Sequence, residues 1–150
     1  MATLTITLTE TLSLGDGSGV DRGTTNIQTI SSINEVDHRI MDIQTAYVDI
    51  LKFGSAAGAG TFEDGAVKYL RITNLDGSNF VTIRIKQSDA EYFIKLGPED
   101  HFLLGDNSMD AHEDGDTALG TAESLANIDI ISAKANTAIC QIEYFVASVD

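Results

Sequence analysis

Few side chains of this sequence could carry out catalysis, and their spacing matches no hydrolytic motif. The patterns GxSxG, HExxH and SxxK are all missing from the sequence. The three histidines, His38, His101 and His112, form no HxH or HxxxH pair. We therefore expect His38 to pack in or on a strand and the other two to lie in a solvated acidic region rather than to bind zinc. The sequence predicts no catalytic residue, no cofactor and no enzymatic activity.

Carboxylates offer the second kind of chemistry, because Asp and Asn side chains at short spacing are what Ca²⁺ requires. Between residues 96 and 132 there are nine Asp or Glu and no Lys or Arg. The calcium candidates in this stretch are Asp106, Asp110, Asp114 and Asp116. They do not follow the D-x-[DN]-x-[DN]-G pattern. We interpret 106–116 as a solvated acidic loop, with binding of an ion or a basic partner as the alternative.

The remaining candidates are one thiol and the aromatic rings. Cys140, the single cysteine, cannot form a disulfide within the chain, and its place in an alternating segment predicts a buried small hydrophobe. The tyrosines Tyr69, Tyr92 and Tyr144 and the six phenylalanines lie mostly in strand-like segments. We expect these rings to pack in a core rather than to stack on sugars.

Length and charge limit the classes of protein that remain. The chain has 150 residues with 43% hydrophobic side chains, which predicts a single domain spanning 1–150. Nine Lys or Arg against 23 Asp or Glu give a net charge of −14, which disfavours nucleic acid as a partner. No apolar run approaches the roughly 20 residues of a membrane span, and the first residues lack the basic region of a signal peptide. We therefore expect no membrane partner.

The elements that would position these side chains follow a period of two residues. In TLTITLTETLSL, Leu4, Ile6 and Leu8 alternate with threonines, which predicts a half-buried strand. Residues 1–14 are therefore interpreted as an edge strand or an inter-subunit strand. A Gly- and Asp-rich loop (15–23) and a second strand within 24–33 follow.

The rest of the chain continues this pattern. We expect two strands within 36–53, joined near Gln44, although a helix fits the same apolar spacing. Asp76-Gly77 predicts a β-hairpin between VKYLRITN and FVTIRIK, and LANIDIISA with NTAICQIEYFVAS predicts a second hairpin. The chain is therefore predicted to be all-β, an antiparallel, jelly-roll-like β-sandwich of eight to ten strands.

Two segments carry a resemblance to a known group of proteins. YLRITNLDGSNFVTI (Tyr69–Ile83) and FIKLGPEDHFLL (Phe93–Leu104), with the succession of strands around them, resemble small β-sandwich virion proteins of tailed bacteriophages, particularly marine ones. The resemblance implies a non-enzymatic structural protein of the virion that decorates or cements the capsid by binding the major capsid protein. We also expect a homo-oligomer, and the strong negative charge favours the outer capsid surface, away from packaged DNA.

Within this hypothesis, the contacts are expected from the first strand and from the small-residue loop. The predicted partner contacts are Thr3, Thr5, Thr7, Thr9, Gly58 and Gly60, because an edge strand can extend a neighbour's sheet and glycines permit close approach. Two alternatives stay open. The first is a tail, knob or fibre-adaptor protein of the virion, and the second is a calcium-dependent adhesin or carbohydrate-binding module.

Overall fold

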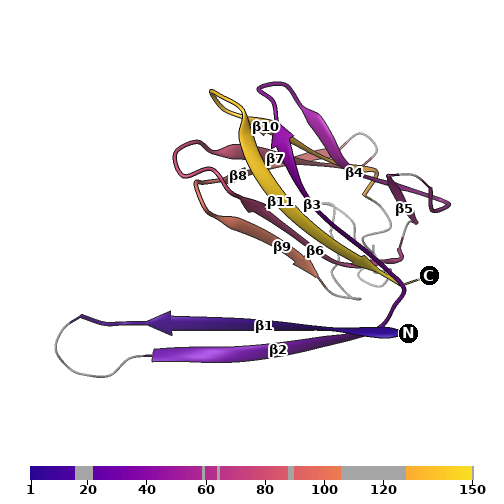
Figure 1. Ribbon diagram of the computed structural model, residues 1–150, viewed down its shortest axis with the longest axis horizontal. Coiled ribbons are helices and arrows are strands. Elements are labelled where there is room, and N and C mark those ends of the chain that lie inside the picture. The colour runs from indigo at the N-terminus through magenta and orange to yellow at the C-terminus, as the bar shows by residue number, and fades with distance from the viewer. Residues whose placement is uncertain (16–21, 59, 64, 88–89, 106–127, 150) are drawn as a thin grey trace, which may run out of the picture. The chain divides into compact units, whose positions relative to one another are not determined.

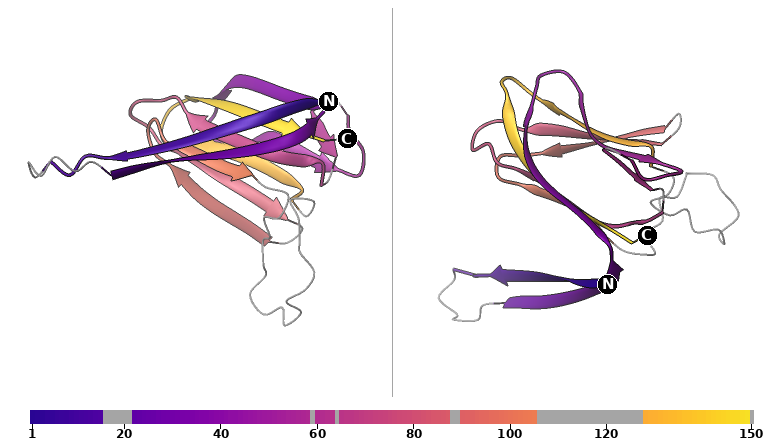
Figure 2. Two further views of the ribbon diagram at one scale, coloured as in Figure 1. Left: turned by 90° about the horizontal axis from the view of Figure 1, so that it is seen from below. Right: turned by 45° about the vertical axis from the view of Figure 1, so that its right-hand side comes forward.

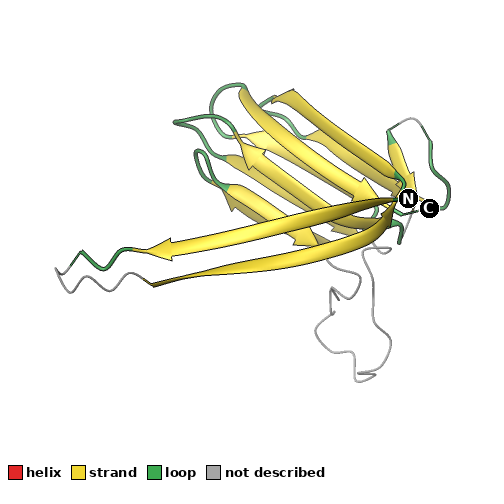
Figure 3. Ribbon diagram, turned by 60° about the horizontal axis from the view of Figure 1, so that its bottom comes forward, coloured by secondary structure: helices red, strands yellow, loops and turns green. Residues whose placement is uncertain are grey.

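The computed structural model of the protein describes residues 1–15, 22–58, 60–63, 65–87, 90–105 and 128–149. Every regular element in this part of the chain is a β-strand, as Figure 3 shows. The chain divides into two compact units, residues 1–33 and residues 34–150. The segment expected as an edge or inter-subunit strand lies in the first unit, where it pairs with its own partner strand.

The first unit is an antiparallel hairpin of β1 (Ala2–Leu12) and β2 (Arg22–Ile33), coloured indigo and purple in Figure 1. The register pairs Thr5 with Thr29 and Thr9 with Thr25. Alternating β-branched residues favour this extended backbone. The register shifts between Ala2 and Leu4, opposite Ser32, which has a φ of 64°. Part of the segment expected as the Gly- and Asp-rich loop, residues 16–21, lies outside the described residues.

The second unit consists of two sheets. One has the order β5-β4-β10-β7-β8 and the other has the order β3-β11-β6-β9. The right-hand view of Figure 2 separates these two layers. Their strands are β3 (Glu35–Ile43), β4 (Val48–Gly54), β5 (Thr61–Glu63), β6 (Val67–Asn74), β7 (Val81–Gln87), β8 (Ala90–Leu96), β9 (His101–Gly105), β10 (Ile130–Ala135) and β11 (Cys140–Ser148).

The core lies between the two sheets. It joins Ile43, Leu70 and Ile142 of the four-stranded sheet to Ile83 and Ile131 of the five-stranded sheet, and all five are at most 2% exposed. Along β11 the side chains of Cys140, Ile142, Tyr144 and Val146 are buried, as their alternation predicts. The predicted all-β sandwich is therefore confirmed, and so is the expected burial of Cys140.

The strand boundaries agree with the sequence more closely than the strand pairing does. The segment 36–53 forms two strands, β3 and β4, and not a helix. The described residues contain eleven strands rather than eight to ten. Strand β5 was not predicted, because three residues are too few to show an alternation.

Both predicted hairpins of the sandwich are wrong. Strand β6 pairs with β11 and β9, while β7 pairs with β10 and β8, so the Asp76-Gly77 turn connects the two sheets. Strands β10 and β11 also lie in opposite sheets. A turn sequence reverses the direction of the chain, but it does not determine whether the two strands that it joins pair in one sheet. Two strands that each bury one face can also pack against each other from opposite sheets across a shared core.

Asn74 connects two of these turns. Its side chain is fully buried, and its Nδ2 donates to the carbonyl oxygens of Asn79 and Gly97, both at 2.8 Å. Its Oδ1 accepts a hydrogen bond from the backbone N–H of Asp76 at 3.1 Å. One amide side chain thus fixes the β6–β7 corner against the β8–β9 turn, and burial is tolerated because every polar group is paired.

Candidate functional site

The predicted contact residues Thr3, Thr5, Thr7 and Thr9 all lie on β1 and are exposed. Threonine also lies opposite two of them, because Thr5 pairs with Thr29 and Thr9 pairs with Thr25. The hydroxyl oxygens of Thr9 and Thr25 are 3.4 Å apart. This face of the hairpin, which we call the threonine face, therefore presents short hydroxyl side chains from both strands.

Apolar side chains of the hairpin are also exposed. Leu8 and Leu12 of β1 are 43% and 54% exposed, and Ile27 of β2, opposite Thr7, is 68% exposed. By contrast, Ile30 and Ile33 near the end of β2 are buried. The sequence pattern predicted a half-buried Leu4 and Ile6, which is what the structure has, but the series becomes exposed from Leu8 onward.

The two units differ in charge. Residues 1–33 carry one Arg and three Asp or Glu, a net charge of −2, whereas residues 34–150 carry eight Lys or Arg and twenty Asp or Glu, a net charge of −12. The strands β1 and β2 themselves contain one acidic residue, Glu10, and one basic residue, Arg22, so the ribbon that they form carries no net charge. It therefore meets less long-range repulsion from a second acidic molecule than the rest of this chain would.

The other two predicted contact residues, Gly58 and Gly60, belong to the second unit. They line a small cavity of about 200 Å³ whose walls include Glu35, Asp37 and Arg39 of β3. The N–H of Gly58 and the carbonyl of Thr61 are hydrogen-bonded at 3.0 Å, which closes the loop before β5. Gly60 has a φ of +76°, a conformation that favours glycine. These glycines therefore shape the loop, and they lie in a different unit from the threonines.

Two charged groups of this cavity, Asp37 and Arg39, are paired with each other. Asp37 accepts a hydrogen bond from the Tyr144 hydroxyl at 2.8 Å and another from Arg39 Nε at 2.9 Å. Burial, followed by the hydrogen bond to Asp37, raises the pKa of Tyr144 to about 12. The tyrosine thus stays protonated and acts as a donor, which ties β11 to the edge strand β3.

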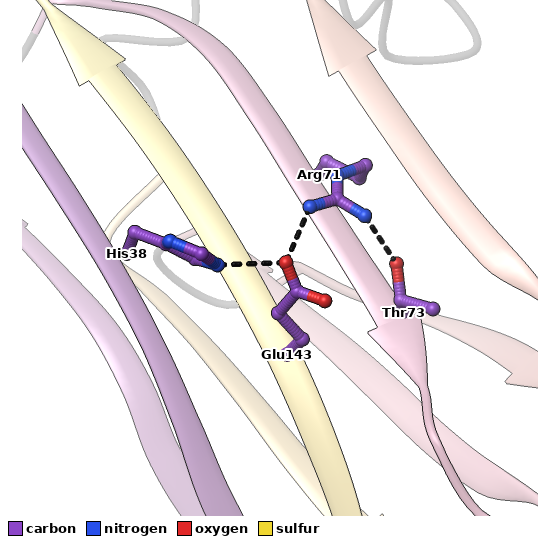
Figure 4. A network of polar contacts seen from close by, with 4 residues as sticks. All are labelled: His38, Arg71, Thr73 and Glu143. Atoms are coloured by element: carbon purple, nitrogen blue, oxygen red, sulfur yellow. Dashed lines mark hydrogen bonds and ion pairs between the residues drawn. The ribbon is translucent and has the colours of Figure 1, made fainter.

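A polar network crosses the outer side of the four-stranded sheet (Figure 4). Glu143 Oε1 on β11 accepts hydrogen bonds from His38 Nε2 on β3 at 2.7 Å and from Arg71 on β6 at 2.6 Å. Arg71 also donates to the Thr73 hydroxyl at 3.0 Å. The hydrogen bonds from His38 and then Arg71 hold the pKa of the Glu143 carboxyl below its usual value. These groups bind each other across three strands, so His38 is a surface residue of a strand, one of the two places expected for it.

The outer side of the five-stranded sheet carries a cluster that the sequence analysis did not identify. The Arg84 guanidinium lies over the Tyr47 ring, 4.3 Å from its centroid, and Lys95 Nζ lies 4.4 Å from the centroid of Phe80. Phe93, the cross-strand partner of Arg84, is 56% exposed. The sequence contained one signal for this cluster. Polar and charged residues alternate with apolar ones along β7, which predicts that they share its outer face: Thr82, Arg84 and Lys86 against Val81, Ile83 and Ile85.

The expectation that the rings pack in a core holds for some of them and fails for others. Tyr69 and Tyr144 are 8% and 3% exposed, whereas Tyr92 is 45% exposed and Phe93 is 56% exposed. Strand β8 is an edge strand of its sheet in the described structure, with β7 as its partner. Side chains on an edge strand have fewer neighbours to cover them.

The metal-site candidates are not tested by the structure. Asp106, Asp110, Asp114, Asp116 and His112 lie outside the described residues, while His101 lies on β9 with its side chain exposed. Within the described ranges, no three His, Cys, Asp or Glu side chains are grouped as a metal ion would need. That part of the chain also contains no helix long and apolar enough to cross a membrane.

Comparison of the chain with protein family models, with curated proteins and with solved structures found no match.

Proposed function

We propose that this protein is a non-enzymatic structural subunit of a phage virion, which attaches to the major capsid protein on the outer capsid surface as a decoration or cement subunit. It acts as a homo-oligomer and uses the hairpin as its attachment element. The observation that carries this proposal is the hairpin itself, a long, nearly uncharged ribbon with exposed apolar residues and an exposed threonine face.

The physical reason lies in the small size of this unit. Within the described residues, β1 and β2 pair only with each other. A two-stranded hairpin is marginally stable in water, and it gains stability when its edges or faces bind another chain. Exposed Ile27, which lies on the threonine face between Thr25 and Thr29, would be removed from water in such a complex, which contributes roughly 25 cal/mol per Å² of apolar surface.

The topology of the second unit supports a virion role by analogy, and we propose that this unit is a jelly roll. Without β5, its eight remaining strands form two sets of four, β4-β10-β7-β8 and β3-β11-β6-β9. Along the chain, each strand of these sets is followed by a strand of the opposite set, except that β7 is followed by β8. Jelly rolls recur in viral capsid proteins and lectins, although a fold alone does not determine function.

A repetitive particle explains why a modest contact surface would be enough. Many copies of one binding site allow a homo-oligomer to bind through several weak contacts at once, and the lattice gains stability by mass action. The charge of −12 on residues 34–150 favours a place on the outside of the shell, away from packaged DNA.

The decisive experiment introduces charge on the hairpin of the full chain. Thr7→Lys together with Ile27→Lys places two like charges on a cross-strand pair. Val36→Lys with Ile40→Lys, two exposed residues of β3, is the control with the same change of charge. The number of copies that co-sediment with purified particles lacking the protein is measured by quantitative mass spectrometry. We expect the hairpin variant to lose binding about tenfold, equivalent to roughly 1.4 kcal/mol, and the control to stay near wild type.

Two results would contradict the proposal. Equal binding of both variants would exclude the hairpin as the attachment element. A low copy number confined to one vertex of the imaged particle would replace the capsid role by that of a tail, knob or fibre-adaptor protein.

A further inference from the structure

The outer side of the five-stranded sheet gathers most of the cations of an acidic protein. Of the eight Lys or Arg in residues 34–150, five lie on strands of this sheet, and the other three, Arg39, Lys68 and Arg71, lie on the four-stranded sheet. We call this surface the cationic-aromatic face. Its residues are Tyr47, Lys52, Phe80, Arg84, Lys86, Phe93, Lys95 and Lys134.

Strand register places these cations in neighbouring rows. Arg84 lies opposite Phe93 on β8 and Ser132 on β10, while Thr82 lies between Lys95 and Lys134. Adjacent strands are about 4.8 Å apart, and residues i and i+2 on one strand are about 7 Å apart. The face therefore presents a two-dimensional array of positive charge.

The charges are only partly neutralised by carboxylates. Arg84 lies 3.4 Å from Glu91, and Lys52 lies 3.3 Å from Asp49. Lys95 and Lys134 form no ion pair with any carboxylate of the described residues, and instead lie over the rings of Phe80 and Tyr47 at 4.4 and 5.3 Å. A cation over an aromatic ring is held in place but keeps its charge.

Arg84 lies at the centre of this array. It donates to the Ser132 hydroxyl at 3.1 Å, and its guanidinium carbon lies 4.3 Å from the centroid of Tyr47. Its Nε is buried and has no hydrogen-bond partner among the described residues. Phe93, next to it on β8, leaves more than half of its side chain in solvent.

From these features we infer that the cationic-aromatic face binds an anionic polysaccharide, a chain of sugars that carries carboxylate or sulfate groups. Lysines at separate positions match charges spaced along a linear polymer, and the exposed Phe93 ring offers an apolar surface to the C–H face of a sugar. The carboxylates elsewhere on the molecule are screened beyond about 8 Å at physiological ionic strength.

Two other polyanions fit these observations less well. The first is an acidic protein. The cores of protein interfaces are depleted in lysine, whereas this face contains four lysines. Single-stranded nucleic acid needs successive open rings on which its bases stack. On the described part of this face, Phe93 is open, but Tyr47 is covered on one side by Arg84.

The test measures binding of the full chain to size-defined oligosaccharides by isothermal titration calorimetry. The ligands are an oligomer of uronic acids, a sulfated oligomer of the same length, neutral dextran and oligo(dT). We expect binding to one or both anionic sugars that weakens with added salt, and no binding to dextran. The uronate and sulfate arms identify which anionic group is preferred.

Matched variants locate the binding. Lys95→Gln with Lys134→Gln should reduce the affinity for the anionic sugar about tenfold. Arg39→Gln with Lys68→Gln, on the other sheet, changes the net charge equally and should alter the affinity less than about twofold. Phe93→Ala should weaken binding by several fold, while Ile40→Ala, at a similarly exposed residue on β3, should leave it unchanged.

Three outcomes would overturn the inference. The first is that neither anionic sugar binds. The second is that the Lys95/Lys134 variant and the Arg39/Lys68 variant lose the same affinity for the sugar. The third is that oligo(dT) binds as tightly as the sugars. Thermal unfolding of each variant shows whether a loss reflects misfolding. This face and the hairpin use different residues, so sugar binding and capsid attachment can fail independently.

Discussion

The hairpin and the sandwich are built from the same kind of strand but are stabilised differently. In the sandwich, residues such as Ile43, Ile83 and Ile142 are fully buried between two sheets. In the hairpin, Leu12 and Ile27 are more than half exposed, and the two strands pair with each other from Ala2 and Ile33 to Leu12 and Arg22. The contrast indicates that side-chain packing contributes more to the stability of the sandwich than to that of the hairpin.

Truncating one isoleucine in each region gives the largest expected difference. Ile83→Ala removes a fully buried side chain from the core and should lower the free energy of unfolding by about 2–5 kcal/mol. Ile27→Ala, at 68% exposure, should lower it by less than about 0.5 kcal/mol. Urea unfolding followed by far-ultraviolet circular dichroism measures both. Similar losses would show that the hairpin is as well packed as the core.

A second comparison uses two asparagines. Asn74→Ala leaves the carbonyls of Asn79 and Gly97 without their buried donor, and we expect a loss of about 2–3 kcal/mol. Asn26→Ala, an exposed residue of β2, should be nearly neutral. Differential scanning calorimetry compares the two variants. An Asn74→Ala protein as stable as Asn26→Ala would mean that the corner does not depend on this amide.

These comparisons also show which parts of the fold were predictable from the sequence. Alternation located β3 and β4 on either side of Gln44, because the burial of one face of a strand is a local property of its residues. The partners of β6 and β7 were not predictable in the same way, since the Asp76-Gly77 turn is compatible with pairing in one sheet or with crossing between two. The choice depends on β9, β10 and β11, which lie far along the chain.

The candidate sites also differ in whether they depend on one strand or on the pairing of several strands. The exposed threonines of β1 could be predicted, because their alternation with Leu4 and Ile6 is visible in the sequence. The cationic-aromatic face could be predicted only in part. Arg84 and Lys86 alternate with buried residues, but the placement of Lys95 and Lys134 beside them requires the register of three strands.

Titration of tyrosine tests the sandwich alone, because residues 1–33 contain no tyrosine. Tyr144 donates to Asp37, and its pKa is raised from 10.0 to about 12. A raised pKa stabilises the fold below pH 10, and this contribution is lost as the pH rises from 10 to 12. Tyr144→Phe should cost about 1 kcal/mol at neutral pH and remove this part of the alkaline loss.

The measurement is urea unfolding at a series of pH values, with Tyr92→Phe as the control because that ring is 45% exposed. The control should keep the pH dependence of the wild type. If Tyr144→Phe keeps it as well, the hydroxyl of Tyr144 does not couple β11 to β3 in solution.

The smallest expected effect comes from backbone strain, which among the described residues occurs at one non-glycine residue in each region. Glu99, in the β8–β9 turn, has a φ of 61°, and Ser32, at the end of β2, has a φ of 64°. Glycine adopts this conformation without the steric cost borne by other residues, but it also increases the entropy of the unfolded chain. We expect Glu99→Gly to raise the free energy of unfolding of the sandwich by about 0.5 kcal/mol. Ser32→Gly should leave the unfolding transition of the sandwich unchanged and slow only the hydrogen exchange of the hairpin amides. If both variants shift the main unfolding transition equally, the two regions unfold as one cooperative unit.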